Sequence, residues 1–418
     1  MTASVGSVSF WLSRLVWRLL GGICFNRIDV LGREKLPDSG PVLYVALHRN
    51  GVVDGLAYMR TVPQALPMVS AQWHRSALGR FFFAGIAVAR DKDRKRAIAV
   101  RNAVPPGETG TDHNAAALSS CVDHLSHGGE LLICPEGTSS LGPQPLPFKS
   151  GAARVAQTAL QRGIPLKVVA LGIFYERAWE WQSRVQVVVG ETYSPGRDDN
   201  LDVVQNKVCA LLLAVAERFD SPAAQEQAEA LAYAAALGTR RNYAEVLLSL
   251  RHGISDRLRE KFVVLRQLAK DKRAFLHQGV PLLPAGSTWV YWLLWLITAP
   301  IYIAGAVFNL PIIAAALYAP KRFADENNVI ALWRLLGALP AALAWWACIA
   351  AAAVMLHSLQ LPAAYVALTA FWIRYHYHMR KLSVTCANSI LLAAARPQLL
   401  ALRETLLEEV GDAPRQTA

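Results

Sequence analysis

The segment VLYVALHRNGVVDG (residues 42–55) combines a strand pattern with two ionisable side chains in a short loop. An apolar run ends at Leu47, His48 follows it directly, and Asp54 comes six positions later. A histidine at the end of a strand is open to substrate, and a nearby carboxylate can accept its other ring N–H and raise its basicity. The pair therefore predicts a general base that takes a proton from an alcohol. A structural histidine is the alternative.

Around this segment, residues 30–200 alternate short β-branched runs with helix-like segments. Strands that are separated by helical patterns and by Gly and Pro turns indicate a sheet with helices packed on it. We therefore predict an α/β fold, with a mixed sheet flanked by helices. The predicted strands include VLYVAL (42–47), LLIC (131–134), KVVALGIF (167–174) and RVQVVVG (184–190).

A second segment with chemical potential is LLICPEGTSSLGPQPLPFKSGAARVA (residues 131–156). After the predicted strand, Glu136, Gly137 and Thr138 form a tight turn, in which the glycine lets a ligand approach the backbone closely. Lys149 precedes a helical run, and a lysine beside helix-start amides can hold an anionic headgroup. The alternative is a strand–turn–helix connection whose charges are merely exposed.

The segment GIAVARDK (residues 85–92) predicts a short strand that ends at Arg90. The planar guanidinium of arginine is well suited to a phosphate or a carboxylate. The alternative is a solvated arginine at the start of a loop. The six cysteines show neither metal-ligand spacing nor a compact disulfide framework, so we predict reduced thiols and no metal site.

The N-terminal segment VSFWLSRLVWRLLGGICF (residues 8–25) has apolar residues at helical spacing. Arg14 and Arg18 fall on another side, and two tryptophans lie close together. This pattern predicts an amphipathic helix that lies in a membrane interface. A core helix with two snorkelling arginines is the alternative.

Hydrophobic residues make up 53% of the chain, and two long segments, 289–319 and 335–373, contain no Asp, Glu, Lys or Arg. About 20 residues suffice for one membrane span. Both segments are too long for the core helix of a soluble protein, and polar or proline residues interrupt each of them. We therefore predict a helical hairpin or re-entrant pair in each run. The interrupting residues are Pro300, Asn309 and Pro311 in the first run and Gln360 and Pro362 in the second.

The net charge of +12 is concentrated near the apolar runs. Residues 201–283 show helical patterns without a strand pattern, and their part 240–273 is strongly basic. Basic residues also flank both runs. Because positive flanks stay on the cytoplasmic side, this predicts an inner-membrane protein with its catalytic domain on the cytoplasmic face. The alternative for the basic segment is a solvated helical face. Nucleic-acid binding is excluded, since no aromatic-interleaved recognition module appears.

The motifs occur in one order and together resemble the glycerophospholipid acyltransferase superfamily, which includes lysophosphatidate and glycerol-phosphate acyltransferases. The resemblance covers roughly residues 25–195 and is more specific than any single motif. The segments that carry it are VLGREKLPDSGPVLYVALHRN (30–50), GIAVAR (85–90), CPEGTSS (134–140) and GIPLKVVALGI (163–173).

The resemblance implies that a fatty acyl chain is moved from acyl-CoA or acyl-carrier protein to the hydroxyl of a glycerolipid precursor in phospholipid biosynthesis. The acceptor would be 1-acylglycerol-3-phosphate or glycerol-3-phosphate, and the other partners would be membrane lipids. No metal or redox cofactor is implied, and no acyl-enzyme forms. The resemblance implies that His48 is the general base and that Asp54 orients it. It further implies that Glu136, Gly137 and Thr138 bind the acceptor, and that Arg90 and Lys149 hold its headgroup.

Three features depart from the usual pattern of this superfamily. Five residues, not four, separate His48 from Asp54, and Ser139 stands where an arginine commonly follows the Pro-Glu-Gly-Thr motif. The second departure favours a phosphate-free acceptor, such as lyso-ornithine lipid, as an alternative. The C-terminal apolar runs resemble the membrane extension of a bacterial subgroup. A non-catalytic lipid-binding membrane protein is a further alternative.

These observations predict five parts of the chain. They are an N-terminal amphipathic membrane-associated helix (1–29), an acyltransferase domain (30–200), a basic helical segment (201–285), transmembrane or re-entrant helical hairpins (286–380), and a C-terminal helix and tail (381–418).

Overall fold

The computed structural model describes residues 8–88, 110–237 and 240–412. The chain divides into two compact units. The first unit contains the N-terminal helix and most of the residues from 28 to 216. The second contains residues 23–27, residues 175–184 and the chain from 217 onward.

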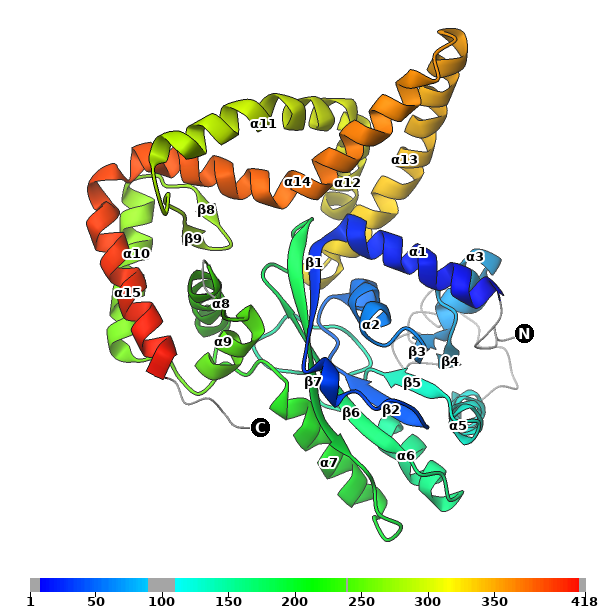
Figure 1. The fold of residues 1–418 in the computed structure, drawn as a ribbon. Helices are drawn as coiled ribbons and strands as arrows, with labels where there is room; N and C mark the ends of the chain where they lie inside the picture. Colours follow the sequence, from blue (N-terminus) through cyan, green and yellow to red (C-terminus); the bar gives the residue numbers. More distant parts are fainter. Residues whose placement is uncertain (1–7, 89–109, 238–239, 413–418) are drawn as a thin grey trace. The chain divides into compact units, whose positions relative to one another are not determined.

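A seven-stranded sheet is the centre of the first unit (Figure 1). Its strand order is β1-β7-β6-β2-β5-β3-β4, and β2 pairs in parallel with both β5 and β6. The connection from β6 to its neighbour β7 (176–182) is too short for a parallel crossover, so the sheet is mixed. The strands are β1 (Phe25–Leu31), β2 (Val42–Ala46), β3 (Leu66–Ser70), β4 (Ile86–Val88), β5 (Glu130–Ile133), β6 (Lys167–Tyr175) and β7 (Ser183–Tyr193).

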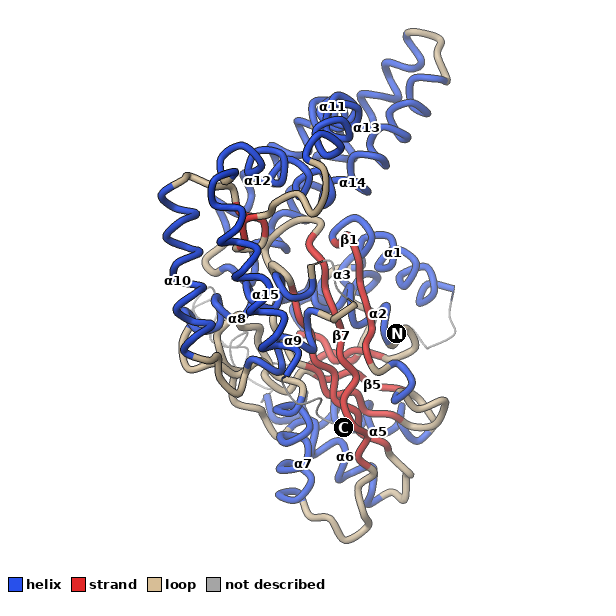
Figure 2. Tube along the Cα trace, turned by 60° about the vertical axis from the view of Figure 1, so that its left-hand side comes forward, coloured by secondary structure: helices blue, strands red, loops and turns tan. Residues whose placement is uncertain are grey.

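Helices cover the sheet of the first unit, as Figures 1 and 2 show. The core packs alternate residues of the central strands, such as Leu43, Val45 and Val168, against α5, α6 and α7. This arrangement confirms the predicted mixed sheet flanked by helices. The helices of this unit are α1 (Val8–Cys24), α2 (Asp54–Thr61), α3 (Ala77–Phe82), α5 (Gly110–Ser126), α6 (Gly151–Gln161) and α7 (Leu201–Ala214).

Helix α1 buries Arg14 and leaves several apolar side chains exposed. Arg14 is buried, donates to the carbonyl of Ala65 (2.8 Å) and contacts the sulfur of Met59. Trp11, Leu15 and Leu19 are exposed on the opposite side. Arg14 is therefore a packing residue within this unit, and the exposed part of the helix carries large apolar side chains together with Arg18, a composition that suits an interfacial helix.

The second unit is helical, with one small hairpin that the sequence analysis missed. Gln278 and Gly279, both with positive φ, connect β8 to β9. Each strand has only two residues, too few for an alternating pattern, so the prediction of helices alone for 201–283 was wrong here. The elements are α8 (Pro222–Ala236), α9 (Tyr243–Leu250), α10 (Asp256–Asp271), β8 (Leu276–His277), β9 (Val280–Pro281), α11 (Thr288–Phe308), α12 (Leu310–Phe323), α13 (Ile330–Met355), α14 (Gln360–Leu391) and α15 (Arg396–Asp412).

Each apolar run folds as two helices, but the helices pair differently from our prediction. The first run breaks at Asn309 and the second at residues 356–359. Helix α12 packs along α13 and α11 along α14, so the main packing partners belong to different runs. Gly337 lies against the α12 backbone and Gly305 against Trp372. The predicted hairpin within each run was wrong, because α12 packs mainly on the next helix, α13, and α11 packs mainly on the distant helix α14.

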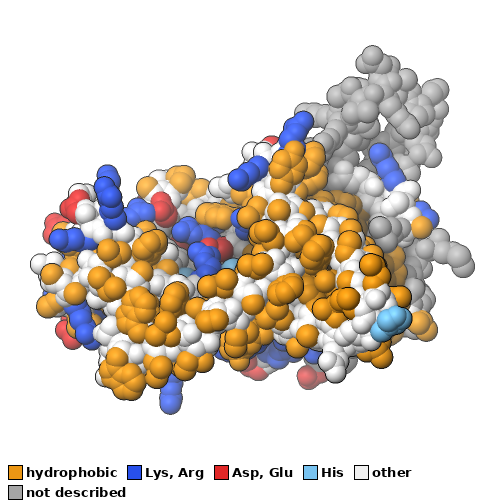
Figure 3. Space-filling view, turned by 90° about the horizontal axis from the view of Figure 1, so that it is seen from above, with side chains coloured by type: hydrophobic (Ala, Val, Ile, Leu, Met, Phe, Trp, Pro, Cys, Tyr) orange, Lys and Arg blue, Asp and Glu red, His pale blue; other side chains and the backbone are white. Residues whose placement is uncertain are grey.

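Two helical segments of the described chain, Thr288–Phe308 and Asn327–Met355, are long and apolar enough to cross a membrane by length and composition. Only 11% and 6% of their most apolar windows are buried within the protein. Figure 3 shows hydrophobic side chains spread over the exposed face of this region. Such exposure in water is costly, which indicates membrane association.

Candidate active site

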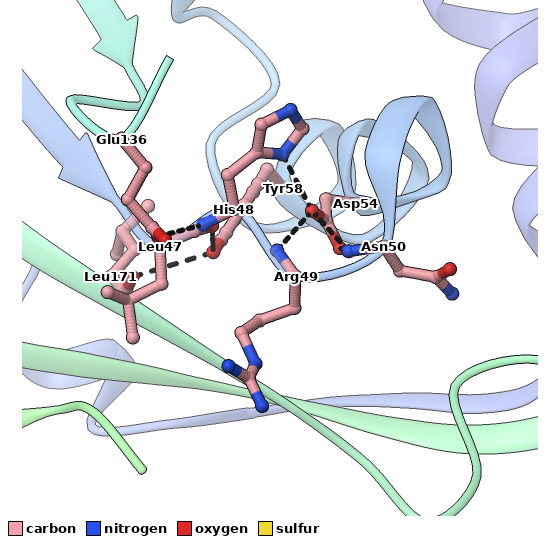
Figure 4. Close-up of polar contacts among 8 residues, drawn as sticks. All are labelled: Leu47, His48, Arg49, Asn50, Asp54, Tyr58, Glu136 and Leu171. Atoms are coloured by element: carbon pink, nitrogen blue, oxygen red, sulfur yellow. Dashed lines mark hydrogen bonds and ion pairs between the residues drawn. The ribbon is translucent and has the colours of Figure 1, made fainter. Parts of the chain in front are cut away.

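His48 and Asp54 form a hydrogen-bonded pair at the end of β2 (Figure 4). His48 Nδ1 lies 2.9 Å from Asp54 Oδ2, and the side chains are 21% and 2% exposed. The five intervening residues form a turn in which Gly51 has φ 58° and residues 51–53 make a 3-10 helix. The additional residue is thus absorbed without separating the two side chains.

The carboxylate of Asp54 is held from several directions. Its oxygens accept the backbone N–H of Arg49 (2.8 Å) and that of Asn50 (2.9 and 3.0 Å), in addition to contacting the ring of His48. These donors fix the orientation of the carboxylate. With Nδ1 facing Asp54, Nε2 points away from it in Figure 4, which leaves that nitrogen as the proton acceptor of the site.

Parallel pairing of β2 with β5 brings Glu136 to His48. Because the carboxyl ends of parallel strands meet at one edge of a sheet, the residues after β5 lie beside those after β2. Glu136 Oε1 accepts the backbone N–H of His48 (2.8 Å), and Oε2 accepts that of Leu146 (3.0 Å). Burial raises the pKa of Glu136, while these two N–H donors and the charge of Arg49 oppose the rise.

Three residues that hold the histidine segment were not predicted. The Arg49 side chain is buried, and its Nη1 donates to the carbonyl of Gly142 (2.8 Å). The backbone N–H of Ser140 donates to the carbonyl of His48 (2.9 Å). The Tyr58 hydroxyl donates to the carbonyl of Leu47 (2.7 Å). These contacts involve backbone groups, which no side-chain motif reveals.

The remaining predicted residues lie on the turn after β5 or outside the described residues. Gly137 and Thr138 are half-buried, and Lys149 is exposed two residues before α6. A Cβ at Gly137 would lie 3.3 Å from Lys149 Nζ, so the ammonium lies beside this turn. Arg90 lies outside the described residues.

Helix α1 packs directly on the helix that begins with Asp54. The ring of Trp17 fills the space above Gly55, where a Cβ would lie only 2.8 Å from it. Trp17 Nε1 donates to the carbonyl of Phe82 (2.6 Å) at the end of α3. The indole thus connects α1 to two helices of the same unit, one of which carries the carboxylate partner of His48.

Cys134, directly after β5, is a further ionisable group of the site. Burial raises the pKa of the Cys134 thiol well above its usual range, so this cysteine stays protonated and unreactive. Within the described part of the chain, no three His, Cys, Asp or Glu side chains are grouped so that they could hold a metal ion. Because Asp54 holds the ring through Nδ1, the pair can take a proton at Nε2 of His48.

Comparison with known proteins places this site in a family. A model of the acyltransferase family matches residues 27–173. A 1-acyl-sn-glycerol-3-phosphate acyltransferase of Chlamydomonas reinhardtii is 25% identical over 204 residues. Both matches support the glycerophospholipid acyltransferase superfamily for the domain that contains this site. The match with the algal acyltransferase covers 47% of this chain and 56% of that protein, so the chain spans about half the length of this relative.

A solved acyltransferase of the superfamily is also similar. The crystal structure of the 1-acyl-sn-glycerophosphate acyltransferase PlsC from Thermotoga maritima matches with a TM-score of 0.36 and 15% identity. This match covers 49% of the present chain and 77% of the PlsC chain. The superfamily inferred from the four motifs is thereby confirmed by the family model and the algal relative.

Proposed function

We propose that the protein is a membrane-bound O-acyltransferase with His48 as its general base. It moves a fatty acyl chain from acyl-CoA or acyl-carrier protein to the hydroxyl of a glycerolipid precursor. The observation that carries this proposal is the distance of 2.9 Å between His48 Nδ1 and Asp54 Oδ2 in a domain of the acyltransferase family. The partial exposure of the ring supports it, because the other ring nitrogen must reach substrate.

The proposed reaction is a direct transfer without an acyl-enzyme. His48 Nε2 takes the proton of the acceptor hydroxyl while its oxygen attacks the carbonyl carbon of the thioester. The tetrahedral intermediate then releases the thiolate, which receives the proton from His48 and leaves as a thiol. Asp54 keeps Nδ1 protonated and stabilises the positive ring that exists between the two steps.

The proposed acceptors are 1-acylglycerol-3-phosphate and glycerol-3-phosphate, as for the algal relative that is named for the first of them. Lys149 beside the Gly137 turn would attract their phosphate. Thr138 would line the same turn, and we assign Arg90 a phosphate contact from its sequence motif alone. A phosphate-free lysolipid, such as lyso-ornithine lipid, is the second candidate, because Ser139 replaces the arginine that commonly follows this motif.

We further propose that the protein resides in the cell inner membrane, with the catalytic domain on the cytoplasmic face. The two apolar helical segments and the exposed apolar face of α1 support membrane insertion and interfacial binding, respectively. The basic residues that flank the apolar helices support the cytoplasmic orientation.

An acyl-transfer assay with purified protein in detergent tests the proposal. The wild type and His48→Ala are offered glycerol-3-phosphate, 1-acylglycerol-3-phosphate and lyso-ornithine lipid, each with acyl-CoA and with acyl-carrier protein. We expect thioester consumption by the wild type with a phosphate-bearing acceptor. Turnover with lyso-ornithine lipid alone would select the second candidate. Equal rates for the wild type and His48→Ala would reject His48 as the general base, and no thioester consumption above background by the wild type would leave only a lipid-binding function.

A further inference from the structure

The loop between β5 and α6 holds both backbone polar groups of His48. Glu136 Oε1 accepts the N–H of His48 (2.8 Å), and the N–H of Ser140 donates to the carbonyl of His48 (2.9 Å). The histidine that follows a strand would otherwise lie in an unpaired loop. Its backbone is instead fixed from both sides by residues that are about 90 positions away in sequence.

The other oxygen of Glu136 is fixed by a donor that the local sequence isolates. Leu146 lies between Pro145 and Pro147, which have no backbone N–H, so Leu146 supplies the single donor of this tripeptide. That N–H donates to Glu136 Oε2 (3.0 Å). The middle of the loop is fastened separately, because Arg49 Nη1 donates to the carbonyl of Gly142 (2.8 Å).

Glu136 is badly placed to bind an acceptor. The residue is only 2% exposed, and each of its carboxylate oxygens already accepts a backbone N–H. Its negative charge would also repel a phosphate-bearing acceptor at short range. Lys149, which is exposed on the same loop, has the charge and the accessibility for that task.

We infer that Glu136 is a positioning residue that sets the backbone of His48, not a ligand of the acceptor. This inference rests on the proposed function of His48. With the backbone held by Glu136 and the ring held by Asp54, only one orientation of Nε2 is available to the acceptor hydroxyl. A displacement of about 1 Å at such a group reduces a rate about 100-fold.

Two variants of Glu136 separate positioning from acceptor binding. Glu136→Gln keeps the size but turns an amide N–H toward one of the two backbone donors, and Glu136→Asp keeps the charge but is too short to reach both. We expect kcat to fall about 10- to 100-fold in each, with the KM for the acceptor within about 2-fold of the wild type. Glu191→Gln, which changes an exposed carboxylate paired with Lys35, is the matched control.

A large rise in the acceptor KM with kcat unchanged would overturn the inference, and so would unchanged kinetics. Thermal melting and normalisation to folded protein remove effects of lower stability. A structure of the wild type with bound 1-acylglycerol-3-phosphate decides the question even if both variants fail to fold. A carboxylate still bonded to the His48 N–H supports the inference, and one bonded to the acceptor contradicts it. Absence of transfer by the wild type would instead reject the proposed function.

Discussion

His48 and His277 both lie at the end of a short strand, but their surroundings differ in charge and exposure. His48 follows β2, is partly exposed and faces the Asp54 carboxylate at 2.9 Å. His277 ends β8 in the second unit, is 1% exposed, and its Nδ1 lies 2.7 Å from the hydroxyl of Tyr233. The His48 ring faces a carboxylate with Nδ1, and its Nε2 points away from that carboxylate. The His277 ring faces the neutral hydroxyl of Tyr233 and is inaccessible to solvent.

The charges near His277 make this contrast sharper. Burial lowers the pKa of His277 to about 3, and the nearby cations Arg380, Lys381 and Arg184 act in the same direction. The ring therefore stays neutral at physiological pH and serves as a packing and hydrogen-bonding group. A strand-end histidine is suited to proton transfer when a carboxylate faces it, and to packing when burial and cations keep it uncharged.

The largest expected effect comes from replacing each histidine with alanine. His48→Ala should reduce acyl transfer about 1,000-fold, because it removes the proton acceptor, while the melting temperature stays nearly unchanged. His277→Ala should lower the melting temperature and leave turnover per folded molecule nearly unchanged, since it leaves a cavity and removes the hydrogen bond to Tyr233, at a cost of about 3 kcal/mol. Turnover per folded molecule and thermal melting in detergent measure both. If His277→Ala abolished turnover of folded protein, the contrast would be wrong.

A smaller effect is expected for Asp54→Asn. The asparagine side chain keeps the shape, but its amide N–H groups face the backbone donors of Arg49 and Asn50. We expect transfer to fall about 100-fold and the free energy of unfolding by about 1–3 kcal/mol. Single-turnover rates and chemical denaturation test this. Wild-type activity would show that the His48 ring does not depend on the carboxylate.

The contact of α1 with α2 can be tested with two glycines. Gly55→Ala forces a Cβ to within 2.8 Å of the Trp17 ring, next to Asp54, and should destabilise the first unit by about 1–3 kcal/mol with some loss of activity. A Cβ at Gly22, within α1, meets no atom within 4 Å, so Gly22→Ala is the control and should be neutral or slightly stabilising. Equal melting temperatures would argue against tight packing of Trp17.

The contrast between the two histidines also predicts a dependence of stability on pH. His277 has a folded-state pKa of about 3, below its usual value of 6.5, so the unfolded state binds more protons between these values. Stability is therefore full above pH 6.5 and falls as the pH drops toward 3, by at most about 1.4 kcal/mol per unit from this group. Melting curves from pH 7.5 to 4.5 should show a shallower decline in His277→Gln. Identical curves would contradict the neutral ring.

The parts of the molecule that could be predicted are those that short-range sequence patterns determine. The hydrophobic run 42–47 gave a strand, and the proline and asparagine residues marked the helix break near position 309. The pairing of His48 with Asp54 follows from their spacing, because the intervening turn is short. The inward orientation of Arg14 was not predictable, since its partner is a backbone carbonyl 51 positions away.

What escaped prediction depends on backbone groups and on distant partners. No side-chain pattern shows that the N–H of Leu146 faces Glu136, so this contact could not be predicted. The strands β8 and β9 are too short for any periodicity, and glutamine at the first turn position, Gln278, is not a usual turn residue. The pairing of α11 with α14 depends on a glycine that contacts Trp372 far along the chain.

Each apolar helix of the first run packs mainly on a helix of the second run, and this arrangement predicts how the chain behaves when it is cut between the runs. A cut between α12 and α13, at residues 324–329, leaves two fragments whose packing surfaces face each other: α12 against α13, and α11 against α14. In either fragment alone, each apolar helix lacks its main packing partner, whereas the two fragments together restore both helix pairs. Pieces translated from separate messages should therefore recombine in the bilayer, and each alone should be removed by proteases.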